Sequence, residues 1–342
     1  MSFLQDTRQI VDTVFGAMAA EVLFTAARLG VADRVGDAEC SAADLAAMYN
    51  ADAGSFTRFL RAMAAMGLLT EAEPSRFRTT SAGGLLRSDH PASLRAFIQM
   101  FGDPAMLGAW RQLETSVRTG ATTFDKVYGT SIFEYLGQQP ELSAQFNAAM
   151  RQGTTLIAHS LPNSFDFSRF RTVADLGGGD GTLLAAVLVA NPDLRGILFD
   201  SAEGLAQADA TFDAAGVRDR ATGIVGDFFN SAPSGAELYL LKSVIHDWND
   251  EQCATILGHV RRVIPDDGRL LIIEPVVPAV TDGTMPLTTY LSDLNMMVNT
   301  GGRERTYDEF EQLCTAAGFR LHSAIGLPPA ASFSMLEARP IG

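Results

Sequence analysis

Alternating strand-like and helix-like segments fill the chain from about residue 172 onward, and this alternation restricts the fold more than any other feature. Strands that are joined by helices require right-handed crossovers, which produce a mostly parallel sheet with helices on both faces. The strand-like runs are "RTVADL", "RGILFD", "ATGIV", "AELYLLKSV", "RLLIIE", "FRLHSAIG" and "SFSMLEARP". The pattern predicts an α/β fold with a doubly wound, mostly parallel, seven-stranded sheet of the Rossmann-like type.

The first half of the chain has a different pattern, with apolar residues at helical spacing and few strand signals. Within it, Ser41 can cap a short helix with Asp44 at the return position, a second helix ends at Gly67, and a hairpin-like segment follows. Two helices and a hairpin indicate a winged-helix unit. We therefore expect two domains, a helical one over residues 1–165 and an α/β one over residues 166–342.

The winged-helix pattern also leaves open a second class of function, a DNA-binding regulator. Arg58 and Arg61 would lie on the outer face of the second helix, but the chain carries a formal net charge of -14. Such an acidic surface repels nucleic acid and anionic membranes, so we expect neither as a partner. A packing module with the winged-helix shape is the favoured interpretation.

A glycine-rich stretch, "DLGGGDG", follows the first predicted strand of the α/β part. Glycines there let the backbone turn tightly and let a ligand approach closely. A dinucleotide fingerprint that uses Gly177 and Gly179 would need a third glycine where the chain has Thr182. Because Asp175 and Asp180 would also stand close to a pyrophosphate, the loop favours a ligand without phosphates.

Acidic residues end the next two strands. Asp200 can accept hydrogen bonds from both hydroxyls of a ribose, and Asp227 can accept one from an adenine amino group while Phe228 stacks on the ring. Either acid could instead cap the helix that follows it. The order of glycine loop, acid and acid-aromatic pair at three successive strand ends favours a nucleoside site.

These motifs, together with "FNAAM", "LLKSVIHDW", "EPVVP" and "GGRERTYDEFEQL", resemble those of the S-adenosylmethionine (SAM)-dependent O-methyltransferases of the plant caffeate and bacterial polyketide type. The resemblance covers nearly the whole chain. It implies SAM as the cofactor, S-adenosylhomocysteine (SAH) as its product, and no metal. It also implies a set of cofactor-binding residues: Gly177, Gly179, Asp200, Asp227, Phe228 and Lys242. Family members commonly have Leu-Pro after the ribose aspartate, where this chain has Ser201 and Ala202.

His246 follows the fourth predicted strand and should face the same crevice as the glycine loop. A phenol has a pKa of ~10 and is a poor nucleophile at neutral pH, so its methylation needs a general base. Histidine has a suitable pKa. Glu274 ends the next strand, and the resemblance places it and Glu304 on either side of His246 as orienting acceptors. Glu304 could instead pair with Arg303 or Arg305.

An aromatic small molecule is the acceptor that the resemblance implies, bound mainly by apolar side chains. The candidate acceptor-binding residues are Phe101, Trp110, Phe146, Met150, Asn295 and Met296. Methionine and phenylalanine on helices are more often ordinary core residues. The first helical segment is apolar on more than one face, which, with the resemblance, predicts a homodimer formed through the N-terminal helices.

Three cysteines without CxxC spacing indicate neither a zinc site nor a disulfide framework, and they favour a cytoplasmic enzyme. The main interpretation is methyl transfer from SAM to a hydroxyl, with a phenolic hydroxyl of an aromatic small molecule as the expected acceptor. A SAM-binding family member that instead performs decarboxylation, hydroxylation or cyclisation is the alternative within the same fold. His246 with both glutamates disfavours that alternative.

Overall fold

The computed structural model describes residues 3–327 and 332–342, and it divides into two compact units between Leu107 and Gly108. The first unit contains a winged-helix region together with helices that precede and follow it. Its elements are α1 Phe3–Leu29, α2 Val31–Val35, β1 Cys40–Ser41, α3 Ala42–Met48, α4 Ala53–Ala65, β2 Leu69–Glu73, β3 Arg76–Thr79, α5 Ser81–Gly84 and α6 Arg95–Phe101.

The winged-helix region has the predicted arrangement of α3, α4 and the antiparallel hairpin β2–β3, to which β1 adds a third strand. Ser41 caps α3 by accepting a hydrogen bond from the amide of Asp44, as the sequence predicts. On α4, Arg61 forms a bidentate ion pair with Glu71 of the hairpin. One of the two arginines of this helix is therefore engaged within the fold.

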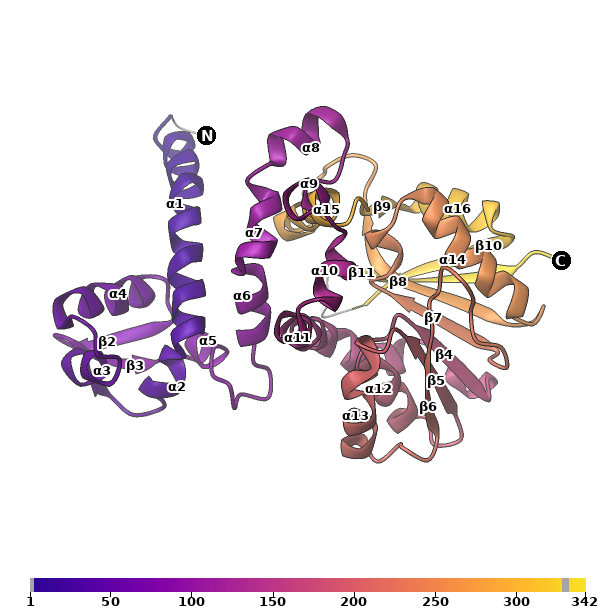
Figure 1. The fold of residues 1–342 in the computed structure, drawn as a ribbon, viewed down its shortest axis with the longest axis horizontal. Coiled ribbons are helices and arrows are strands. Elements are labelled where there is room, and N and C mark those ends of the chain that lie inside the picture. Colours follow the sequence, from indigo (N-terminus) through magenta and orange to yellow (C-terminus); the bar gives the residue numbers. More distant parts are fainter. Residues whose placement is uncertain (1–2, 328–331) are drawn as a thin grey trace. The chain divides into compact units, whose positions relative to one another are not determined.

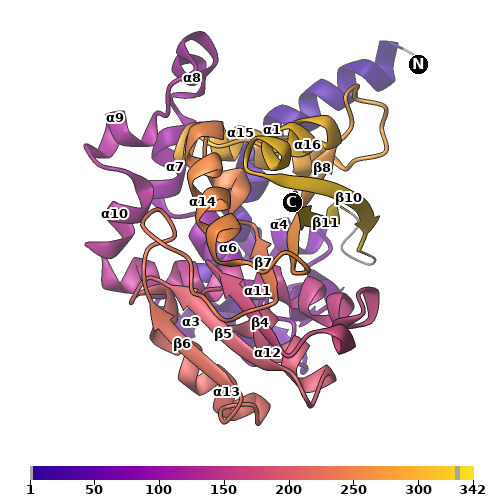
Figure 2. The ribbon, with the colours of Figure 1, turned by 90° about the vertical axis from the view of Figure 1, so that its right-hand side faces the viewer.

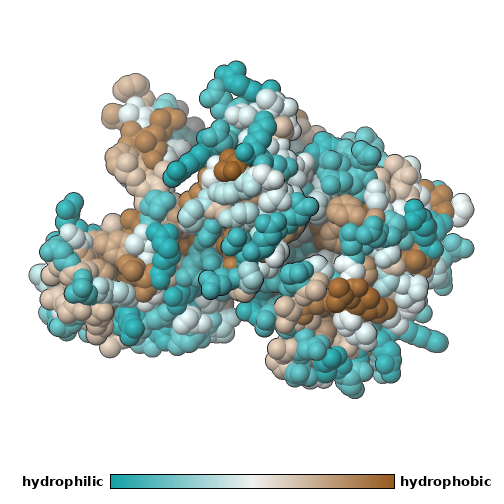
Figure 3. Space-filling view, in the orientation of Figure 1, coloured by the Kyte–Doolittle hydropathy of each residue, from teal (hydrophilic) through white to brown (hydrophobic). Residues whose placement is uncertain are grey.

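Helix α1 exposes a run of large apolar side chains, which Figure 3 shows as brown atoms over this helix. By length and composition alone it is also the one helix among the described residues that could cross a membrane, although only 11% of its most apolar window is buried. The exposed residues are Phe3, Leu4, Ile10, Val11, Val14, Phe15 and Met18. So large an apolar surface on one helix calls for a partner.

The second unit consists of a central sheet and the helices that precede and cover it (Figure 1). Helix α7 Pro104–Trp110 spans the division between the units. The helices that follow are α8 Leu113–Thr119, α9 Phe124–Tyr128, α10 Ile132–Gly137, α11 Pro140–Ser164, α12 Thr182–Ala190, α13 Ala208–Ala215, α14 Asp250–Val263, α15 Leu287–Asn299 and α16 Tyr307–Ala316. Capping boxes begin both α14 and α16, formed by Asn249 with Gln252 and by Thr306 with Glu309.

The sheet contains the seven predicted strands in the order β10-β11-β8-β7-β4-β5-β6, and the two-residue strand β9 pairs with β8. The five strands from β8 to β6 in this order run parallel (Figure 2). Strand β11 pairs antiparallel with both of its neighbours, β8 and β10. The bounds are β4 Thr172–Leu176, β5 Arg195–Asp200, β6 Ala221–Val225, β7 Leu238–Lys242, β8 Arg269–Val277, β9 Arg305–Thr306, β10 Phe319–Gly326 and β11 Phe333–Pro340.

Two hydrophobic cores lie on the two faces of the sheet, because alternate residues of each strand point to opposite sides. On β7, Leu238 and Leu240 pack into the core with α11, α12 and α13, whereas Tyr239 and Leu241 pack into the core with α14 and α16. The carboxyl ends of the parallel strands meet between these layers. Residues 108–165 belong to the same compact unit as the sheet, and the predicted division of functions at residue 165 stays a prediction.

Candidate active site

A cavity of about 390 Å³ lies at the carboxyl ends of the parallel strands, within the size range of small-molecule sites. Helix α11 forms its other wall. All six predicted cofactor residues line it: Gly177, Gly179, Asp200, Asp227, Phe228 and Lys242. The sheet brings them together because neighbouring parallel strands end at the same edge.

The glycine loop turns through left-handed backbone conformations that other residues rarely adopt. Gly177 has a φ of 67° and Gly179 a φ of 57°. A Cβ atom at Gly177 would also lie 2.7 Å from Cγ2 of Val244, so the loop and the residues after β7 pack closely. Glycine at these positions therefore satisfies both the turn and the close approach of backbone to the cavity.

Asp200 holds the glycine loop from the end of β5. Its Oδ2 accepts a hydrogen bond of 2.8 Å from the amide of Gly179, and its Oδ1 accepts one of 2.7 Å from the amide of Ser201. Burial raises its pKa. Each carboxylate oxygen has a second lone pair, so Asp200 can both fix the loop and accept hydrogen bonds from a ligand in the cavity.

Asp227 and Phe228 close another side of the cavity. Asp227 accepts from the amide of Phe229 at 2.8 Å and from Nδ2 of Asn230 at 2.8 Å, and so it stabilises its own turn. Phe228 packs edge-on against Trp248, with ring centroids 6.0 Å apart. The turn fixes the direction of Asp227, and the aromatic contact fixes the ring beside it.

Buried acids give the cavity a preference for cationic ligands. Neither carboxylate oxygen of Asp175 has a hydrogen-bond partner among the described residues, and burial, reinforced by Asp200, raises its pKa to about 7. Lys242 donates a hydrogen bond of 3.0 Å to Oγ1 of Thr154 on α11. Burial lowers the pKa of Lys242, against the opposing charges of Glu274 and Asp175. A cationic group beside Asp175 would relieve this unfavourable burial.

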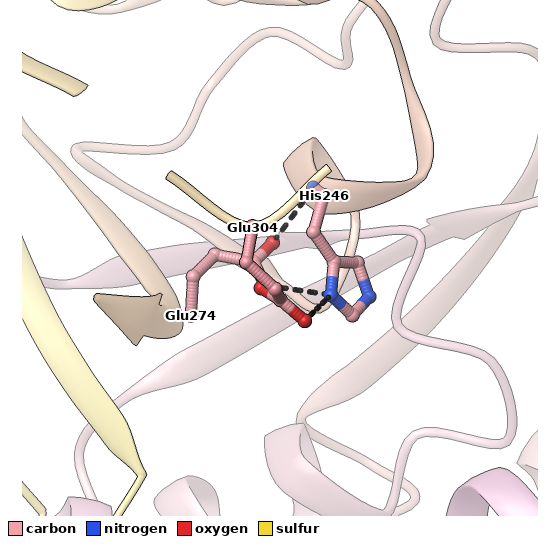
Figure 4. Close-up of side chains that lie close together, drawn as sticks. All are labelled: His246, Glu274 and Glu304. Carbon is pink, nitrogen blue, oxygen red and sulfur yellow. Dashed lines mark hydrogen bonds and ion pairs between the residues drawn. The ribbon is translucent and has the colours of Figure 1, made fainter. Parts of the chain in front are cut away.

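His246 lies in a short loop between β7 and α14, here called the histidine loop (residues 243–249), and Figure 4 shows both glutamates beside its ring. Its Nδ1 atom lies 3.1 Å from Oε1 of Glu304 and 3.6 Å from Oε2 of Glu274. Both glutamate side chains are fully buried. With Nδ1–H donated to a glutamate, the lone pair of Nε2 is available to accept a proton.

The two glutamates contact different parts of the histidine loop. Oε1 of Glu274 accepts hydrogen bonds from the backbone amides of Val244 and Ile245, at 2.9 Å each, and from that of His246 at 3.4 Å. Oε1 of Glu304 accepts from Oγ of Ser292 on α15 as well as facing the imidazole. Glu274 thus holds the loop backbone, and Glu304 holds the ring. The alternative pairing of Glu304 with Arg303 or Arg305 is wrong, because both arginines pair with Asp250.

Burial and charge act in opposite directions on the imidazole. Burial lowers the pKa of His246, but the charges of Glu274, Asp247 and Glu304 outweigh it and raise the pKa to about 10. Burial in turn raises the pKa of Glu274 to about 7 and that of Asp247 to about 6. Oδ1 of Asp247 lies 3.9 Å from Nε2 of His246, and Asp247 lines the cavity. The free nitrogen of the imidazole therefore lies beside a cavity-lining residue, although His246 is not itself among the residues that line the cavity.

The three side chains also have a spacing that a metal ion could use, since one ligand atom from each lies within 4.8 Å of the others. The closest of these atoms already share hydrogen bonds with each other, with Ser292 and with backbone amides. The expectation that the reaction uses no metal stays a prediction.

The six predicted acceptor-binding residues lie in three places. Phe146 and Met150 on α11 line the cavity itself. Trp110 donates a hydrogen bond of 2.8 Å from Nε1 to Oδ1 of Asn295, and Met296 lies on the same helix, α15, as Asn295. Phe101 lies on α6 in the first unit, where its ring packs against Phe97.

Several cavity residues have no counterpart among the predicted ones. They are Asn147, Arg151 and Thr154 on α11, together with Phe133 and Trp248. The three on α11 recur at the spacing of one helix face with Phe146 and Met150, which is the one signal in the sequence that could have indicated them. Trp248 follows His246 by two residues and packs against Phe133 with ring centroids 5.3 Å apart.

Comparison with known proteins identifies two domain families along the chain. The model of an O-methyltransferase domain matches residues 110–320, and that of an O-methyltransferase dimerisation domain matches residues 11–89. The chain is 44% identical to an O-demethylpuromycin-O-methyltransferase from Streptomyces alboniger over 97% of its own length and 89% of that protein.

Solved structures of such enzymes superpose on nearly the whole chain. One is the crystal structure of LaPhzM, with a TM-score of 0.91, 40% identity, and coverage of 98% of this chain and 99% of that one. Another is human N-acetylserotonin methyltransferase in complex with SAM, with a TM-score of 0.89, 28% identity, and coverage of 99% and 98%.

Proposed function

The chain belongs to the family of SAM-dependent O-methyltransferases, and on this premise we propose that it methylates a phenolic hydroxyl of an aromatic small molecule with His246 as the general base. The observation that carries this proposal is the imidazole itself. Its Nδ1 faces Glu304 at 3.1 Å, and its Nε2 lies 3.9 Å from Oδ1 of Asp247, a residue that lines the cavity. A base held in this tautomer can accept the proton of a hydroxyl.

The residues around the cavity fit the cofactor. Asp200 offers carboxylate lone pairs to the ribose, Phe228 offers a ring to the adenine, and the unpartnered Asp175 suits the cationic amino-acid end. When bound, SAM supplies an electrophilic methyl group on its sulfonium. The chain's own residues then position the acceptor, remove its proton at Nε2 of His246, and stabilise the resulting imidazolium through Glu304.

An aromatic acceptor is supported by the side chains and by the relatives. Phe146 and Met150 line the cavity, and Trp110 is held to Asn295 on α15, the helix that also carries Ser292 next to Glu304. Several relatives are described as acting on aromatic compounds, among them a 2,7-dihydroxy-5-methyl-1-naphthoate 7-O-methyltransferase that is 34% identical. We extend this class of acceptor to the present chain.

We also propose that the enzyme is a homodimer that associates through α1. The exposed apolar residues Val11, Val14, Phe15 and Met18 of that helix lie at the start of the matched dimerisation domain. Burial in a dimer accounts for them without a membrane. The cysteines Cys40, Cys253 and Cys314 are all free thiols, which supports a cytoplasmic location.

The test is a product assay with purified enzyme, SAM and a panel of hydroxylated aromatic acids, naphthoates and phenazines. We expect one phenol to gain one methyl group by mass spectrometry, with stoichiometric SAH. Loss of carbon dioxide or gain of oxygen in the acceptor, with SAM left unconverted, would instead establish the non-methylating alternative. Binding of duplex DNA with a steep salt dependence, and no turnover of any acceptor, would favour a regulator.

A further inference from the structure

Arg305 is a fully buried arginine whose guanidinium is directed at the histidine loop from behind. Its Nη1 donates a hydrogen bond of 2.9 Å to the carbonyl oxygen of Ile245. Its Nη2 donates one of 2.8 Å to the carbonyl oxygen of Trp248. Ile245 and Trp248 flank His246 and Asp247, so one side chain spans the part of the loop that carries the imidazole.

The charge of Arg305 is balanced outside the active site. Its Nη2 and Nε atoms lie 2.8 Å and 3.2 Å from Oδ1 of Asp250, the first residue of α14. The ion pair leaves Glu304 free to face His246. Since a buried arginine is costly unless all its donors are paired, the contacts with two carbonyls and a carboxylate fix the guanidinium in one position.

Other residues of the same segment also contact the histidine loop. A Cβ atom at Gly302 would overlap the carbonyl groups of His246 and Asp247, so the backbone of Gly302 packs directly on the loop. Glu304 faces the imidazole and is anchored in turn by its amide, which donates to Oδ1 of Asp293 at 2.8 Å. The segment Gly302–Arg305 therefore contacts the loop at its backbone, its ring and its flanking carbonyls.

We propose that Arg305 is a positioning residue for methyl transfer, because it holds the histidine loop in register with Glu304 and so keeps the imidazole oriented. Consecutive residues of an extended segment point to opposite sides. Glu304 and Arg305 therefore contact the loop from two sides, although they are neighbours on one backbone. A shift of either residue would change the distance between Nδ1 of His246 and Oε1 of Glu304. This inference rests on the proposed role of His246 as the base.

Arg305→Lys is the informative variant, since it keeps the positive charge. A lysine lacks the planar fork that reaches both carbonyls and Asp250 together. We expect kcat to fall by roughly 10–100-fold, because small displacements of a catalytic group have effects of that size. The Kd of SAM should stay within about threefold of wild type, because Gly179, Asp200 and Asp227 line the cavity outside the histidine loop.

The pH profile separates positioning from mere structural support. If the imidazole loses its contact with Glu304, its pKa falls toward the ordinary value, and the acidic limb of kcat moves to lower pH. If Arg305 only stabilised the fold, its substitution would lower the thermal midpoint and leave the acidic limb of the kcat profile in place. Arg303→Lys is the matched control: Arg303 pairs with the same Asp250 at 2.8 Å, but its side chain is 45% exposed and it also pairs with Glu309. The Arg303→Lys enzyme should keep the wild-type kcat and the wild-type position of the acidic limb.

Gly302→Ala provides a second variant in case Arg305→Lys fails to fold. The added methyl group would displace the histidine loop at the carbonyl groups of His246 and Asp247. We therefore expect the same lower kcat and the same shift of the acidic limb to lower pH. The inference is overturned if a folded Arg305→Lys or Gly302→Ala enzyme keeps the wild-type kcat, or loses stability with an unmoved limb. An inactive His246→Ala enzyme in the same experiment would support the role of His246 as the base. A fully active one would mean that the proposed function itself had failed.

Discussion

Replacement of Glu304 by glutamine tests the contact that orients the base. The carboxylate is fully buried, and its Oε1 lies 3.1 Å from Nδ1 of His246. A glutamine oxygen can still accept the Nδ1–H bond, but it carries no charge to stabilise the imidazolium that forms during the reaction. Hydrogen bonds to charged groups contribute ~1.5–3 kcal/mol and neutral ones ~0.5–1.5 kcal/mol, so the difference is about 1–1.5 kcal/mol. This difference predicts a roughly tenfold lower plateau of kcat.

The same substitution should also move the acidic limb of kcat. Glu304 is one of three carboxylates that raise the pKa of His246, so its loss lowers that pKa and moves the limb to lower pH. Steady-state kcat measured across the acidic and alkaline range, with saturating SAM and acceptor, reports both effects. Calorimetric titration with SAM serves as the check that the cavity is intact.

Glu274→Gln is the matched comparison. Its Oε1 accepts from three backbone amides, which a glutamine oxygen can also do, and its Oε2 is farther from Nδ1, at 3.6 Å. We expect a smaller defect than for Glu304→Gln. A Glu304→Gln enzyme with the wild-type plateau and an unmoved limb would refute the reasoning, because it would show that Glu304 does not act on the imidazole.

Three further predictions concern the cofactor, the pH dependence and the assembly. Asp200→Asn should weaken SAM binding by at least about tenfold in calorimetry, because a charge-assisted bond to the ribose is lost, and unchanged affinity would leave Asp200 with only its role in the glycine loop. In the wild type, kcat/KM should rise with pH through an apparent pKa above the ordinary 6.5 of histidine, since the base must be unprotonated and carboxylates raise its pKa; a limb at lower pH would contradict that effect. Light scattering should give twice the monomer mass for the wild type and a monomer for Phe15→Glu, which charges an exposed position on α1, and an active wild-type monomer would exclude the proposed dimer.

The sheet and the cofactor cavity were predictable because both depend on regular patterns. Alternating apolar strands and helices predict the parallel sheet, and parallel strands bring their carboxyl ends to one edge. Residues at the ends of those strands or just after them, such as Gly177, Asp200 and Lys242, therefore line one cavity. The caps of α14 and α16 were also predictable, because a capping box depends on residues only three positions apart.

Long-range polar contacts were not predictable in the same way. Arg151 and Thr154 share a face of α11 with Phe146 and Met150, but the same spacing occurs in any packed helix and does not by itself indicate that this face lines a cavity. The sequence "RERT" is typical of an exposed, charged turn, yet Arg305 is fully buried. Its burial depends on two carbonyls and an aspartate more than 50 positions away, at residues 245–250, and no local rule predicts such partners.

The most direct test of the account is the turnover of His246→Ala as a function of pH. If His246 is the base, the variant should bind SAM and the acceptor as the wild type does but lose turnover by ~10²–10⁴-fold at neutral pH. Alkaline pH should restore part of that loss, because a phenolate formed in solution no longer needs a base. Full methyl transfer by His246→Ala at neutral pH would contradict the account, since the imidazole that Glu304 orients would then have no part in removing the proton.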